Sequence, residues 1–90
     1  MFWAAVYDKL DIVKFLADQG AVIDTRNKNN WTPLMQTASN GQLDIVKYLV
    51  VKGADVNART DDGVTPLMLA REHGKRDVVE FLRQHGAKEY

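Results

Sequence analysis

Thr-Pro-Leu-Met at residues 32–35 is repeated at residues 65–68, an offset of 33 residues. Gly-Ala pairs keep the same spacing at 20–21, 53–54 and 86–87. Leu-Asp-Ile-Val occurs at 10–13 and 43–46, with a looser counterpart, Arg-Asp-Val-Val, at 76–79. Many ordered matches at one period indicate a repeated structural unit. The chain of 90 residues therefore contains three copies of one motif, the first of them incomplete.

Each complete copy carries the signals of a short first helix. Thr32 and Thr65 can cap a helix that begins at the next residue, a proline, whose missing N–H would have no partner in the first turn. Gly41 and Gly74 stand where the chain must leave this helix with positive φ. The sequence thus predicts first helices that begin at residues 33 and 66 and stop at these glycines.

A second helix follows in each copy. In the middle copy an apolar stripe is formed by Leu43, Val46, Leu49 and Val50. The first turn of each second helix contains an aspartate, which interacts favourably with the helix dipole: Asp11, Asp44 and Asp77. Glycines at 20, 53 and 86 end these helices. Residues 55–59 and the Asp-Gly pair at 62–63 then predict an extended arm and a tight turn, a hairpin-like finger that leads to the next copy.

These motifs resemble the ankyrin-repeat family, whose pattern is a turn, Thr-Pro-Leu-His, a short helix, Gly, a longer helix and Gly-Ala-Asp-Val-Asn. The resemblance covers the whole chain. It implies an all-α solenoid of stacked helix-turn-helix units joined by β-hairpin-like fingers, with L-shaped units and a concave binding face. We expect one domain over residues 1–90, with a partial repeat at 1–26, a full repeat at 27–59 and a C-terminal capping repeat at 60–90.

Two departures from the family pattern concern single positions. Met35 and Met68 replace the histidine of the motif, so we expect apolar packing where imidazole would form hydrogen bonds with the backbone. Asn30 takes the turn position that Gly63 holds in the next finger. Asparagine is one of the few other residues found with positive φ, so this finger should be only slightly strained.

The two ends of the array differ. Arg71, Arg76 and Arg83 replace Ala38, Leu43 and Val50 of the middle copy, which predicts a polar outer face on a terminal repeat. At the other end, Phe2, Trp3 and Val22 predict an apolar edge without a recognisable cap. Either the chain was cut from a longer array, or this edge meets another chain.

The composition argues against several classes of partner and location. Twelve basic and twelve acidic residues cancel, so we expect no nucleic-acid partner. No apolar stretch approaches the roughly 18 residues that cross a bilayer, so we expect no membrane segment. The absence of cysteine rules out disulfides and thiolate zinc sites and favours a reducing, cytoplasmic location.

The sequence predicts no enzyme, no cofactor and no metal site. His73 and His85 are twelve residues apart without a cysteine partner, which favours solvated helix-end histidines over ligands. Asp61 and Asp62 precede a turn glycine, where bonding to the turn backbone explains them better than a catalytic pair does. The glycines form no phosphate-binding loop.

Aromatic residues fall into two groups. Phe15, Tyr48 and Phe81 recur at one position of the second helix, which predicts a packing role. Trp31 and Tyr7 do not recur, and the resemblance places both on the concave side, where large aromatics are frequent binding anchors. The alternative for Trp31 is that it lies across Val64 of the next finger.

We therefore expect a non-catalytic protein-protein interaction module. The contact positions implied by the resemblance are Lys28, Asn29, Trp31, Asp61, Asp62 and Val64 on the fingers, and Val6, Tyr7, Ser39, Asn40, Glu72 and His73 on the first helices. The middle and last copies differ at these positions but agree at the glycines and apolar positions, as expected of surface and scaffold.

Three alternatives stay open. The chain could be a fragment or assembly unit that self-associates through Phe2 and Trp3, or it could belong to an enzyme whose catalytic domain lies elsewhere in a longer polypeptide. Asn57 stands where some ankyrin proteins are hydroxylated, although an amide that bonds the finger backbone is the favoured interpretation.

Overall fold

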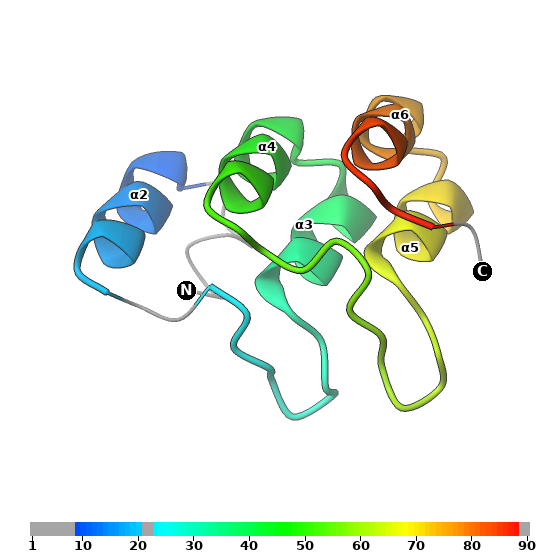
Figure 1. Cartoon of the computed structure of the whole chain (residues 1–90), viewed down its shortest axis with the longest axis horizontal. Helices are drawn as coiled ribbons and strands as arrows, with labels where there is room; N and C mark the ends of the chain where they lie inside the picture. The colour runs from blue at the N-terminus through cyan, green and yellow to red at the C-terminus, as the bar shows by residue number, and fades with distance from the viewer. Residues whose placement is uncertain (1–8, 21–22, 89–90) are drawn as a thin grey trace.

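The computed structural model describes residues 9–20 and 23–88. Five helices lie in these residues: α2 (Leu10–Asp18), α3 (Pro33–Asn40), α4 (Leu43–Val51), α5 (Pro66–Glu72) and α6 (Arg76–Gln84). Figure 1 shows α2, α4 and α6 side by side in one layer, with α3 and α5 in a second layer beneath them. The two loops before α3 and α5 project away from both layers. This is the predicted all-α solenoid of stacked helix pairs, and none of the described helices is both long and apolar enough to span a bilayer.

The predicted starts of the first helices are confirmed. Thr32 has an extended backbone, and its Oγ1 accepts a hydrogen bond from the N–H of Met35 at 3.3 Å. Thr65 does the same for the N–H of Met68 at 3.2 Å. The N–H of Thr32 donates in return to the Met35 sulfur at 3.4 Å. Met35 is fully buried, which confirms the expected apolar packing, but the backbone bond that we expected to be dropped or taken by water is accepted by its thioether.

The predicted helix ends are also confirmed. Gly41 follows α3 with φ +73°, and Gly53 follows α4 with φ +96°. The two glycines differ in their surroundings. A Cβ at position 41 would lie 2.6 Å from Cδ of Lys75, whereas a Cβ at position 53 would meet nothing within 4 Å. Gly41 therefore leaves room for a lysine stem of the next copy, and Gly53 meets a purely local backbone requirement.

The main core joins the two helical layers, and α4 lies at its centre. Val46 and Leu49 are fully buried, as the predicted stripe requires. Leu43 and Val50 are only partly buried, while Ile45, outside the stripe, is fully buried. The reason is that α4 packs against α2, α3 and α6, so more than one face of this helix is covered. A single amphipathic stripe is typical of a helix that buries only one face. Because α4 buries more than one face, the stripe does not describe it fully.

Polar side chains join consecutive copies at one repeated position. The Asn57 amide donates from Nδ2 to the carbonyl of Gly86 at 3.0 Å, and its Oδ1 accepts from the N–H of Lys88 at 2.8 Å. Asp24, 33 residues earlier, accepts from the N–H of Asp55 at 3.2 Å. The Asn57 amide thus bonds the backbone that follows α6. We expected this amide to bond the backbone of the finger instead.

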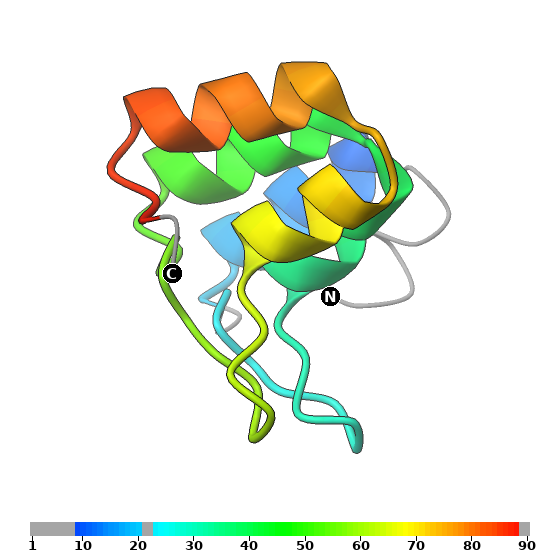
Figure 2. The ribbon, with the colours of Figure 1, turned by 90° about the vertical axis from the view of Figure 1, so that its right-hand side faces the viewer.

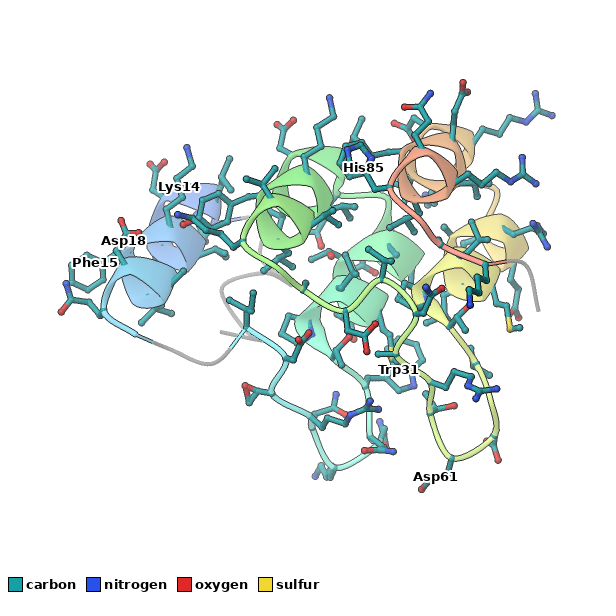
Figure 3. All side chains as sticks on the ribbon, in the orientation of Figure 1. Lys14, Phe15, Asp18, Trp31, Asp61 and His85 are labelled. Carbon is teal, nitrogen blue, oxygen red and sulfur yellow. The ribbon has the colours of Figure 1, made fainter. Side chains whose placement is uncertain are left out.

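The recurring aromatics do not all share one environment. Lys14 Nζ lies 5.8 Å from the centre of the Tyr48 ring, and Lys47 Nζ lies 6.0 Å from that of Phe81. Each ring therefore meets the preceding second helix. Phe15 of α2 has no earlier second helix among the described residues, is 61% exposed, and points away from the other helices (Figure 3). The predicted packing role is wrong for Phe15, because no second helix among the described residues covers its ring as α2 covers Tyr48 and α4 covers Phe81.

Candidate functional site

The candidate site combines the two fingers, residues 27–31 and 60–64, with α3 and α5; we call it the finger surface. Figure 2 shows both fingers extending from the helical layers in the same direction. Each finger runs into the first helix through its capping threonine, Thr32 or Thr65. The caps therefore set the angle between finger and helix and make the unit L-shaped, as the resemblance implied.

Each finger is closed by one backbone bond and one side-chain bond. The N–H of Asn27 donates to the carbonyl of Trp31 at 3.0 Å, while the N–H of Trp31 donates to Asn27 Oδ1 at 3.0 Å. Thr60 and Val64 repeat the arrangement, with Thr60 Oγ1 as the side-chain acceptor at 3.1 Å. Because a side chain replaces the second carbonyl, the fingers resemble hairpin turns, and no strand is formed in the part of the chain that the structure describes.

The finger tips are tied to each other. Asn30 adopts φ +63°, as predicted, and its Nδ2 donates to Asp61 Oδ1 of the neighbouring finger at 3.0 Å. Arg26 donates from Nη1 to the carbonyl of Asn30 at 3.0 Å and to that of Arg59 at 2.9 Å. These bonds hold the fingers in one relative position. We expected Asp61 to bond the backbone of its own turn, but its carboxylate accepts from Asn30, and the side chain that bonds this turn is Thr60.

Trp31 lies partly inside the molecule. Together with Val64 it packs against a small buried cluster formed by Met35, Ala58 and Leu69. Figure 3 shows Trp31 near the bases of the fingers and Asp61 at a finger tip. The indole therefore supports the finger as well as presenting the part of its surface that stays accessible.

The other predicted contact residues divide by exposure. Those that are exposed lie on the finger tips and at the ends of the first helices: Lys28, Asn29, Asn40, Asp61, Asp62, Glu72 and His73. Partly buried are Trp31, Ser39 and Val64, and outside the described residues lie Val6 and Tyr7, as do Phe2, Trp3 and Val22. The exposed set carries both signs of charge.

Arg26 is the residue that sequence reasoning missed. It joins the carbonyls of two fingers, so it helps to hold the surface without belonging to the predicted contact positions. A signal existed, because arginine recurs 33 residues later as Arg59. That recurrence could have indicated a structural role, but only the folded chain shows which carbonyls are within reach.

The histidines lie at helix ends, as predicted. His73 and His85 are the C-cap residues of α5 and α6, and both are exposed. The His85 ring stacks on Phe81 with ring centres 4.0 Å apart, and its Nδ1 lies 2.8 Å from the Phe81 carbonyl oxygen. Within residues 9–20 and 23–88, no group of three potential ligand residues is placed to hold a metal ion.

Comparison with known proteins agrees with this architecture. The family model described as ankyrin repeats (3 copies) matches residues 1–89. No curated protein matches the chain. Ankyrin repeats are generally protein-protein interaction modules and are typically non-catalytic. The repeat period, the paired helices and the match along nearly the whole chain agree, and the chain belongs to the ankyrin-repeat family.

Proposed function

We propose that this chain is a non-catalytic module, a single domain that binds a partner protein through the finger surface. The observation that carries the proposal is the linkage of the two fingers by Arg26 and by the bond between Asn30 and Asp61. Exposed tips that are already held in place lose little conformational freedom when they bind. A surface that is ordered before binding is therefore suited to recognition.

Trp31 is the proposed anchor of the finger surface. Tryptophan is enriched among residues that dominate binding energy, especially when it is held in a packed setting with an accessible side. Packing against Met35 and Leu69 supports the indole in one orientation. Around it, Lys28, Asp61 and other exposed polar residues would supply a rim that favours neither an acidic nor a basic partner.

We place this module in the cytoplasm, because its sequence contains no cysteine and so suits a reducing compartment.

A second candidate function is self-association through the N-terminal edge. The exposed Phe15 ring favours it, because no lysine within residues 9–20 and 23–88 lies over this ring as lysines lie over Tyr48 and Phe81. Sedimentation of the purified chain at increasing concentration tests it. Dimers that disappear when Phe2 and Trp3 are replaced by serine would support the idea, and a strict monomer at high concentration would remove it.

The main proposal is tested by capture of a partner from the native cell, followed by titration of variants into that partner. Trp31→Ala and Tyr7→Ala should each weaken binding by about 1–3 kcal/mol. Because Trp31 also supports the fold, Lys28→Ala and Asn29→Ala are needed as variants that alter only exposed finger residues.

The control is Lys47→Ala, an exposed position on α4 outside the finger surface. It should leave affinity unchanged, and circular dichroism should show that every variant is folded. Loss of binding in Lys47→Ala with full binding in the finger variants would move the site to the outer face and disprove the proposal.

A further inference from the structure

A groove opens beside α5 and α6, the helices at the C-terminal end of the array in Figure 1. Its volume is about 850 Å³. Four cationic residues line it, Arg71, Lys75, Arg76 and Arg83, against one carboxylate, Glu80. The chain as a whole is neutral, so this concentration of positive charge is local.

The groove lies where the repeat pattern would place a following unit. In the middle copy, the side chain of Lys75 from the next copy lies over Gly41. Gly74 is the equivalent glycine of the last copy and lines the groove, and nothing lies within 4 Å of its Cβ position. The groove thus lies on the face of this copy that corresponds to the repeat interface of the middle copy.

Another ankyrin unit fits this interface poorly. In the middle copy the corresponding positions hold Ala38, which is fully buried, and the partly buried Leu43 and Val50. A further unit stacked in the same way would have to cover three guanidinium groups, and removing charged groups from water costs several kcal/mol for each ion before any pairing is counted.

The aromatic contact between units would be lost as well. Lys14 and Lys47 each lie over a ring of the next unit, but the same position on α6 is Glu80. A second copy that stacked its Phe15 here would bring a carboxylate to the face of the ring, which is the negative face of the aromatic quadrupole. Head-to-tail stacking of two copies is therefore disfavoured.

We propose that this groove binds an extended acidic segment of a partner protein. Guanidinium groups match carboxylates in geometry and bind them with two parallel hydrogen bonds, and arginine stems and Val79 give apolar contact to the rest of such a segment. The volume lies within the usual range of pockets that hold ligands, about 300–1,000 Å³. A nucleic acid would favour a longer basic track than four cations in one groove.

The first test uses a fluorescein-labelled ten-residue peptide in which glutamate and glycine alternate, measured by fluorescence anisotropy. Replacing every glutamate by glutamine should weaken binding at least ~10-fold, and raising the salt concentration should weaken it progressively. Absence of binding at millimolar peptide would overturn the proposal. So would a ten-nucleotide single-stranded DNA that binds more tightly than the peptide, because the groove would then be a nucleic-acid site.

The second test locates the peptide. The double variant Arg76→Glu/Arg83→Glu should weaken binding at least ~10-fold and remain folded, because both residues are exposed. The matched control is Lys9→Glu/Lys88→Glu, which makes the same charge change at exposed positions outside the groove. If both double variants lost the same amount of peptide affinity, binding would depend only on net charge. The groove would then be rejected as the binding site. Asn29→Ala, an uncharged change at an exposed finger tip, should bind the peptide normally, so failure of the groove is distinguishable from failure of the finger surface.

Discussion

The copy that contains α3 and α4, the middle copy, and the copy that contains α5 and α6, the last copy, have equivalent helices but different outer sides. Both begin their first helix at a threonine cap and end it at a glycine. They differ where Ala38, Leu43 and Val50 are replaced by three arginines. The middle copy has a neighbour on that side, and the last copy has a groove. Helix boundaries are therefore a local property of each copy, whereas burial depends on what lies next to it.

Exchanging one residue between the copies should give the largest effect. Ala38 is fully buried, and Arg71 at the same repeat position is exposed. Ala38→Arg places an unpaired charge in the core and should cost about 3–5 kcal/mol, enough to unfold a small domain. Arg71→Ala, the reverse exchange, should change stability by less than about 0.5 kcal/mol. Urea denaturation followed by circular dichroism measures both.

Similar losses of stability in Ala38→Arg and Arg71→Ala would contradict the difference between the two copies. They would mean that the outer sides of the two copies have equivalent environments in solution.

Substitutions of the glycines after the second helices should differ in their cost to stability, but by less than the exchange between Ala38 and Arg71 does. Gly53→Val forces a β-branched residue into positive φ and should cost about 1–3 kcal/mol. Gly86→Val meets the same backbone requirement at φ +95° but should cost less, because Ala87 after it is only partly buried, whereas Ala54 after Gly53 is buried, and the chain after α6 can shift more easily. Thermal melts of both variants measure the difference, with Gly53→Asn as a control that tolerates positive φ. An unchanged midpoint for Gly53→Val would show that the residue does not end α4.

The hydrogen bonds that join consecutive copies should differ in their contribution to stability, by a smaller amount than the two glycines do. Asn57→Ala removes two hydrogen bonds to the segment after α6 and should cost about 1 kcal/mol. Asp24→Ala removes one longer contact, to the N–H of Asp55, and should cost less. Chemical denaturation of the two variants side by side checks this order, and the opposite order would show that the junction between the first two copies is the stronger one.

Among the substitutions that remove a contact between copies, Lys47→Ala should have the smallest effect on stability. This side chain is exposed on α4, and its one described contact is with the face of Phe81. A surface contact between a cation and a ring contributes roughly 0.5–1 kcal/mol at most. A shift in the thermal midpoint larger than that of Asn57→Ala would mean that lysine-aromatic contacts between second helices stabilise the array more than the amide bonds do.

The candidate site could be predicted only in part. The finger tips are exposed as expected at Lys28, Asn29 and Asp62, because a hairpin-like turn projects whatever its neighbours are. Trp31 was harder to assign, since its half-buried packing depends on Ala58 at the far end of the same copy and on Leu69 of the following copy. Arg26 was missed for the same reason, because one of the carbonyls that it bonds is 33 residues away.

Local chemistry along the chain was enough to locate the helices and their repeat. A threonine cap, a proline after it and a glycine with positive φ act within a few residues, so Thr32, Gly41 and Gly53 could be interpreted one copy at a time. The exposure of Phe15, the link between Asn30 and Asp61 and the basic groove beside α6 required the folded array. Each depends on whether another copy lies alongside, and contacts between residues about one repeat apart arise only when the copies stack.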